Sequence, residues 1–114
     1  MITGIGTDIV EIARVRKAIS KSFMRKVLSE EEFEKAMSFS EERRIQFLAG
    51  RFAAKESIIK CLSDHEIPNM SDLNIVNDEK GKPMISYKDY RILISISHER
   101  NYATAVAILD EDII

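Results

Sequence analysis

The stretch RFAAKESIIK, residues 51–60, lies in the longest helix that the sequence predicts. At about 100° per residue, apolar side chains between residues 45 and 62 recur on one side, the pattern of a helix that faces a core. Glu56 falls on this apolar side, and Lys60 follows one turn later. A carboxylate removed from water is costly unless a cation pairs with it. Two interpretations of Glu56 therefore stand: a Glu–Lys pair on the helix surface, or part of a functional site.

Capping signals mark where this helix and a shorter one begin. In LSEEEF, Ser29 is the predicted N-cap and Glu32 its capping-box partner. Ser40 precedes the long helix, which is expected to run about 22 residues to Leu62.

The amino-terminal residues 2–10 alternate with the period of a strand. Gly4, Gly6 and Asp8 share one face of that strand. Glycine weakens a strand unless a backbone or ligand must approach closely, so this face is expected to be kept open. For Asp8 the residues alone favour a different role, the cap of a following helix with Glu11 as its partner.

After a polar loop, in which His65 is expected to be solvated, the chain changes to short strands. LNIV and PMISY form one predicted hairpin, whose turn places Gly81 at a special backbone angle. RILISIS and YATAVAIL form a second hairpin with three isoleucines on one face, Ile92, Ile94 and Ile96. The order of elements predicts one α+β domain over residues 1–114, an antiparallel sheet packed against helices.

Composition excludes several classes of protein. The 114 residues carry 17 basic and 19 acidic side chains, so no overall charge favours nucleic acid or a membrane surface. Cys61 is the only cysteine, which fits a reducing compartment, and a cytoplasmic location is expected. No apolar segment approaches the roughly 20 residues of a membrane span.

The chain also lacks the glycine-rich nucleotide loops, paired zinc cysteines and G-x-S-x-G turn of familiar enzymes. Asp8 and Glu56 remain, with Lys60 nearby. Magnesium prefers few protein carboxylates and completes its shell with water and phosphate oxygens, so these residues are compatible with phosphoryl transfer. Arg44, Arg51 and Lys55 lie along one flank of the long helix, and a solvated face is the stronger interpretation of that flank.

Together, GIGTDIVEI, LSEEEF, FLAGRFAAKE, RFAAKESIIK, GKP and ISISHE resemble the holo-acyl-carrier-protein synthases, the small bacterial 4′-phosphopantetheinyl transferases. The resemblance covers nearly the whole chain. It implies transfer of 4′-phosphopantetheine from coenzyme A to a serine of apo acyl carrier protein, with release of 3′,5′-ADP, in fatty acid biosynthesis. It also implies a homotrimer with active sites between subunits.

The same resemblance assigns roles to individual residues. Asp8 and Glu56 are expected to ligate magnesium on the pyrophosphate, with Glu56 also helping to deprotonate the serine, and Lys60 to neutralise the pyrophosphate or assist the leaving group. His98 is expected near the 3′-phosphate. Coenzyme A contacts are expected from Arg43, Arg51, Phe52, Lys60, Lys82, Pro83, Ser97 and His98, the last two from the neighbouring subunit, and carrier-protein contacts from Arg14, Lys21 and Arg25.

One departure and two alternatives accompany this hypothesis. Many relatives have a glycine-rich turn soon after the matching lysine, whereas CLSDHEI contains no glycine. Backbone contacts to coenzyme A in that loop are therefore not carried over. The alternatives are a non-catalytic trimeric module that binds carrier protein, against which Asp8, Glu56 and Lys60 argue, and a structural trimer that binds no coenzyme A.

Overall fold

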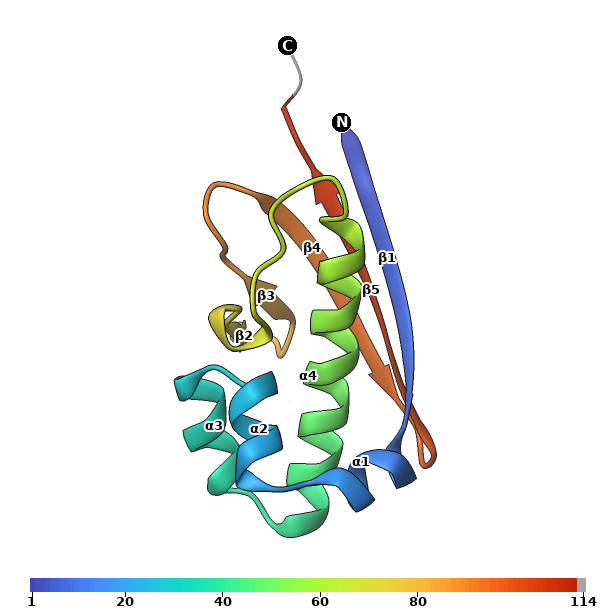
Figure 1. The fold of residues 1–114 in the computed structure, drawn as a ribbon, viewed down its shortest axis with the longest axis vertical. Coiled ribbons are helices and arrows are strands. Elements are labelled where there is room, and N and C mark those ends of the chain that lie inside the picture. Colours follow the sequence, from blue (N-terminus) through green and yellow to red (C-terminus); the bar gives the residue numbers. More distant parts are fainter. Residues whose placement is uncertain (113–114) are drawn as a thin grey trace.

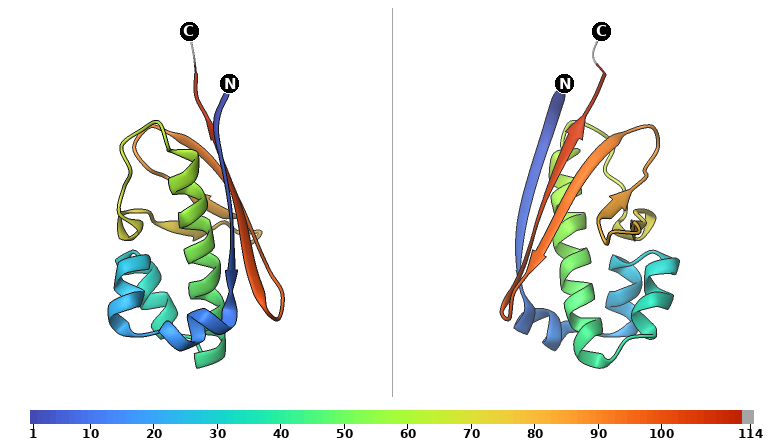
Figure 2. Two further views of the ribbon diagram at one scale, coloured as in Figure 1. Left: turned by 45° about the vertical axis from the view of Figure 1, so that its right-hand side comes forward. Right: turned by 180° about the vertical axis from the view of Figure 1, so that it is seen from behind.

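The computed structural model describes residues 1–112, and helix α4 (Glu41–Cys61) is its central element (Figure 1). One side of α4 packs on a three-stranded antiparallel sheet of order β1-β5-β4. The short helices gather around its amino-terminal end, and the β2–β3 hairpin lies beside them, away from β1 (Figure 2). The remaining elements are β1 (Ile2–Glu11), α1 (Ile12–Ala18), α2 (Lys21–Val27), α3 (Glu30–Met37), the 3-10 helix η1 (Met70–Asp72), β2 (Ile75–Asn77), β3 (Pro83–Ile85), β4 (Arg91–His98) and β5 (Tyr102–Asp110).

This arrangement confirms the predicted α+β class and both hairpins. Gly81 has the positive φ of 84° that its turn requires. The end of the predicted domain, residues 113–114, lies outside the described part of the chain. Within residues 1–112, no helix has both the length and the apolarity to cross a bilayer.

Local capping explains where two of the helices begin. The Ser29 hydroxyl accepts from the Glu32 amide, and the Glu32 carboxylate accepts from the Ser29 amide, so the predicted capping box is confirmed. Ser40 caps α4 as predicted. The predicted Asp8 cap is wrong: α1 begins only at Ile12, and Asp8 lies inside β1 opposite Ala105. Pairing with β5 extends the strand through Glu11 and leaves Asp8 no helix to cap.

The glycine face of β1 is kept open for the backbone of α4. A Cβ added to Gly4 would lie 2.0 Å from the carbonyl oxygen of Cys61, and one added to Gly6 would lie 2.0 Å from that of Ser57. The two glycines therefore let the strand and the helix approach more closely than any side chain would allow. Asp8, next on the same face, is thereby brought close to α4.

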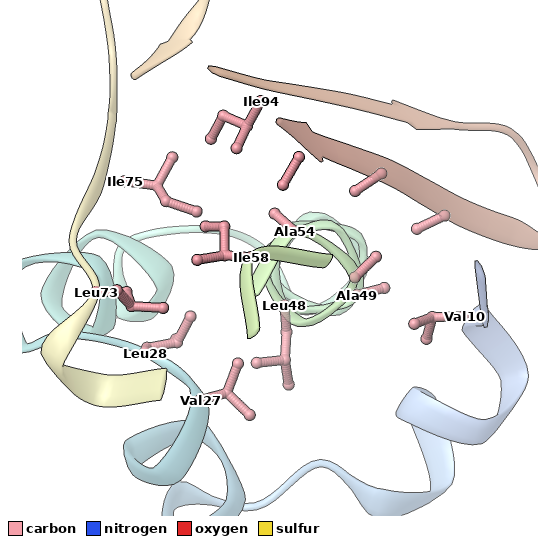
Figure 3. Close-up of a cluster of buried hydrophobic side chains, with 14 of the residues drawn as sticks. Val10, Val27, Leu28, Leu48, Ala49, Ala54, Ile58, Leu73, Ile75 and Ile94 are labelled. Atoms are coloured by element: carbon pink, nitrogen blue, oxygen red, sulfur yellow. The ribbon is translucent and has the colours of Figure 1, made fainter. Parts of the chain in front are cut away.

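Helix α4 is buried on more than the one side that its apolar stripe predicts. Core side chains from other elements surround it, among them Val10, Leu28, Leu73, Ile75 and Ile94 (Figure 3). Lys55 is fully buried and Arg51 is only 6% exposed, so the solvated-face interpretation is wrong for both residues. Their polar atoms find partners in elements far along the chain, which the helical period cannot reveal.

His65 is likewise not the solvated loop residue that the sequence predicts. Its side chain is half-buried, with Nε2 3.2 Å from Oε1 of Glu111 and its ring 5.2 Å from that of Tyr90. The loop that follows α4 contains no glycine at which the helix could end. The amide of Leu62 donates to Ile58 O instead, which satisfies one of the last helical carbonyls.

Candidate functional site

A cavity of about 360 Å³ lies among β1, α1, α2 and α4, and it brings together the two carboxylates that the sequence singled out. Asp8 reaches it from β1 and Glu56 from α4. Both side chains are half-buried. Because Gly6 holds β1 against α4, residues 48 positions apart in the sequence face the same space. The cavity is lined by Asp8, Ile9, Val10, Glu11, Arg14, Val15, Ala18, Phe23, Phe52 and Glu56.

Lys60 joins this group through Asp8. Its Nζ lies 3.3 Å from Oδ1 of Asp8 and donates to the carbonyl of Thr7 at 2.9 Å. Among the described residues, no basic group lies within 4.0 Å of the Glu56 carboxylate, so the predicted helix-surface pair with Lys60 is wrong. The half-buried Glu56 carboxylate therefore has no ion-pair partner within this part of the chain.

The carboxylates suit a magnesium ion shared with a phosphate ligand. Magnesium is commonly held by one or two carboxylates and takes its other ligands from water and substrate phosphates. Asp8 and Glu56 provide these two carboxylates from facing elements. Within residues 1–112, no cluster of three or more His, Cys, Asp or Glu side chains is placed to hold a metal, so an all-protein cage is not formed there. The residues present fit a magnesium site completed by substrate.

A second cavity, of about 230 Å³, lies elsewhere around α4 and is basic and aromatic. Arg43 lies roughly 140° around the helix from Glu56. The guanidinium of Arg43 stacks 4.2 Å from the ring centre of Phe39, and that of Arg51 stacks 4.5 Å from Phe47. Such a surface suits a ligand that carries phosphates. Its lining comprises Lys35, Phe39, Arg43, Gln46, Phe47, Gly50, Arg51, Asn77, Ile96 and His98.

Glu32 pairs with the two buried cations of α4. Its Oε2 accepts from Nε of Arg51 at 3.1 Å, and its Oε1 accepts from Nζ of Lys55. Burial lowers the pKa of both cations, and the Glu32 carboxylate opposes that shift. Lys55 also donates to the carbonyls of Val27 at 2.8 Å and Met70 at 3.0 Å, so its ammonium has three acceptors.

The sequence does not predict this arrangement. Its pattern indicates only a capping-box partner at Glu32 and a basic flank that includes Lys55. The available signal was that Lys55 stands among small residues, in AAKES, on a helix expected to face a core.

The structure separates the predicted coenzyme A contacts into two groups. Phe52 lines the cavity that contains Asp8, whereas Arg43, Arg51 and His98 line the second cavity. Four further predicted contacts line neither cavity. Lys60 is exposed near the end of α4, where it pairs with Asp8, and Lys82 is exposed in the β2–β3 turn. Pro83 pairs with Asn77 of the second cavity, and Ser97 is exposed on β4 next to His98.

The predicted carrier-protein contacts lie on the short helices. Arg14 is exposed on α1 and lines the cavity that contains Asp8 and Glu56. Lys21 and Arg25 are exposed on α2, where the Arg25 guanidinium lies 4.0 Å from the ring centre of Phe33. Basic side chains thus lie beside the carboxylates and on the adjoining helix.

Comparisons with known proteins agree on one family. Residues 4–107 match the model of the 4′-phosphopantetheinyl transferase superfamily. The chain is 44% identical over 116 residues to a holo-[acyl-carrier-protein] synthase of a Geobacillus species, an alignment that covers 96% of this chain and 98% of the relative. It is 40% identical to the Clostridium tetani protein of the same name, with both chains fully covered.

Two solved structures are similar over nearly their whole length. The holo-(acyl-carrier-protein) synthase of Bacillus anthracis, in complex with CoA (3′,5′-ADP), has a TM-score of 0.89 and 35% identity, covering 98% of this chain and 99% of that one. The Neisseria meningitidis holo-[acyl-carrier-protein] synthase has a TM-score of 0.85 and 28% identity, covering 97% of this chain and all of the other.

Proposed function

The chain belongs to the 4′-phosphopantetheinyl transferase superfamily, and from this premise we propose that its two cavities serve the two ends of coenzyme A. The chain transfers 4′-phosphopantetheine from coenzyme A to a serine of apo acyl carrier protein and releases 3′,5′-ADP. The observation that carries the catalytic assignment is the meeting of Asp8 and Glu56 in one cavity beside Lys60.

Asp8 and Glu56 would hold the magnesium ion on which the transfer depends. A magnesium ion held there would supply positive charge to offset the negative charge of the coenzyme A pyrophosphate. Support for this assignment comes from the number and type of the two ligands and from their position on facing elements.

The residues of the chain would carry the proton and the charge. Glu56 accepts the proton of the carrier serine, directly or through water, as the serine oxygen bonds to the phosphorus that bears pantetheine. The bond from that phosphorus to the bridging pyrophosphate oxygen breaks, and 3′,5′-ADP leaves with the electron pair. The Lys60 ammonium stabilises the negative charge on the leaving group.

The second cavity would bind the nucleotide end of coenzyme A. Arg43 and Arg51 contact its phosphates and His98 lies near the 3′-phosphate, while Lys82, Pro83 and Ser97 border the site. Support comes from the stacked guanidinium groups in this cavity and from the Asn77–Pro83 pairing at its edge.

The active site would be shared between subunits of a homotrimer. Two features support this: the catalytic carboxylates and the basic cavity lie far apart around α4, and large apolar side chains are exposed on the sheet. Ile5 is 68% exposed, Ile9 63% and Leu93 50%, a pattern that marks a protein interface. Arg43, Arg51 and His98 line one cavity, so one subunit would provide all three. Asp8 and Glu56 of the same active site would come from the neighbouring subunit.

Mixing two inactive variants tests the shared site. Asp8→Ala and His98→Ala proteins should each be inactive, and subunit exchange between equal amounts should restore about a quarter of wild-type activity, because random mixing completes about one site in four. Light scattering on the same samples reports the assembly. Persistent inactivity after verified exchange, or an active monomer, would contradict sharing.

Carrier recognition would use Arg14 with Lys21 and Arg25, since exposed complementary charges steer encounter with an acidic partner. Arg14→Glu should raise the KM for carrier protein, more so at low salt, and leave the KM for coenzyme A unchanged. Steady-state kinetics at two ionic strengths measure both constants.

The enzyme would act in fatty acid biosynthesis in the cytoplasm, and the free, buried thiol of Cys61 fits such a reducing compartment.

The direct test incubates the protein with apo carrier protein, coenzyme A and magnesium and then weighs the carrier. A mass gain equal to the phosphopantetheine arm is expected, and it should disappear when magnesium is chelated. Carrier binding without a mass gain would favour the non-catalytic module. Failure to bind coenzyme A would favour the structural trimer.

A further inference from the structure

Glu32 connects three elements from a position that is 2% exposed. Its Oε1 accepts from the backbone amide of Ser29 at 2.8 Å and from Lys55. Its Oε2 accepts from the backbone amide of Ile75 at 3.2 Å and from Arg51. Both carboxylate oxygens are therefore used, and each receives one backbone donor and one cation. A capping box requires only the first of these bonds.

This carboxylate fixes the guanidinium of Arg51 on one edge. Nε bonds to Glu32, Nη2 donates to the carbonyl of Ile75 at 3.3 Å, and the guanidinium face lies on Phe47. Within residues 1–112, Nη1 has no protein partner, and no fully buried side-chain nitrogen or oxygen lacks one. Nη1 is therefore not completely buried, and Arg51 lines the second cavity.

A fixed guanidinium binds an anion more tightly than a mobile one. A long arginine side chain loses rotamer freedom when it binds a ligand, and that cost is avoided if the protein already holds the side chain in its bound geometry. Glu32 also provides the anion that two buried cations require, and thereby favours the charged state of Arg51.

We propose that Glu32 is a positioning residue for the phosphate-bearing nucleotide end of coenzyme A, acting through Arg51. The proposal rests on the proposed function of the second cavity as the nucleotide site. Glu32 does not touch the ligand; it holds Arg51 so that Nη1, which has no partner within residues 1–112, is left to bind it. The competing interpretation is purely structural, with Glu32 serving only to cap α3 and to anchor β2.

The test measures binding of adenosine 3′,5′-bisphosphate by calorimetry, because this ligand carries the nucleotide end without pantetheine. Glu32→Gln keeps the length of the side chain and an amide oxygen for the capping box but removes the charge. Its Kd should rise about tenfold, as expected when a charge-assisted contact is disordered. Arg51→Gln should have a similar effect, and the double variant should be no worse than Arg51→Gln alone.

Lys55→Met is the matched control. It removes the other cation from Glu32 and should lower stability while leaving the Kd within about twofold, because Arg51 keeps its partner. If Glu32→Gln alone does not fold, the comparison is made in the Lys55→Met background, where one buried cation and one buried anion are removed together.

Three results would overturn the proposal. The first is a folded Glu32→Gln variant whose Kd equals that of the wild type. The second is a Glu32→Gln change that weakens binding equally with and without Arg51, which would mean that Glu32 acts through β2 rather than through Arg51. If the wild-type protein itself did not bind adenosine 3′,5′-bisphosphate, the nucleotide site would fail together with this inference. That outcome is recognised without any variant.

Discussion

Glu56→Gln is expected to lower the rate of carrier modification by about two orders of magnitude or more while the protein remains folded. Glutamine preserves size and helix propensity but removes both the anionic metal ligand and the base. Within the described residues Glu56 makes no ion pair, so the change breaks no salt bridge there. Stability should therefore change by less than about 1 kcal/mol.

The measurement pairs carrier-modification rates with thermal melts. Magnesium and coenzyme A should raise the melting temperature of the wild type and raise it much less for Glu56→Gln, because the ligands stabilise only the state that binds them. Glu34→Gln, the same chemical change at an exposed position on α3, is the control and should leave both readouts within about twofold of wild type. Near wild-type turnover by Glu56→Gln would remove this carboxylate from the mechanism.

Gly6→Ala is expected to lower the free energy of unfolding by about 3 kcal/mol or more. The added Cβ would stand 2.0 Å from the carbonyl oxygen of Ser57, a backbone atom that cannot turn away. Nor can α4 retreat easily, because the Ser57 hydroxyl donates to the carbonyl of Ala105 on β5 at 3.1 Å. Strand and helix must separate, and Asp8 would move away from Glu56.

Gly50→Ala makes the same substitution where the added atom meets the end of one side chain rather than backbone. Its added Cβ would meet only Cγ2 of Ile96, at 3.3 Å, and alanine is the better residue inside a helix by about 1 kcal/mol. Its stability should therefore stay within about 1 kcal/mol of wild type. Urea unfolding followed by circular dichroism, at one protein concentration, compares the two variants. If Gly6→Ala lost no more than this same amount, the contact between β1 and α4 would be shown to tolerate a side chain.

Features that depend on neighbouring residues could be predicted from the sequence. The capping box at Ser29, the cap at Ser40 and the turn at Gly81 each involve groups within a few positions of one another, and all three appear as expected. Alternation within the strands predicted both hairpins for the same reason. The family motifs added the candidate site residues, which local periodicity alone left open between structural and functional roles.

Features that depend on distant partners could not be predicted in this way. Lys55 and Glu32 are 23 positions apart, and Ile75 and Glu32 are 43 apart. The pattern of residues within one turn of α4 therefore cannot indicate that these groups are buried together. Asp8 lines a cavity rather than capping a helix because pairing with β5 extends β1 past it. The division of the site residues between two cavities follows from how α4 is oriented against the sheet. That orientation is set by the close approach at Gly4 and Gly6, because backbone contact across the interface, not the helical period, determines which faces of α4 remain accessible.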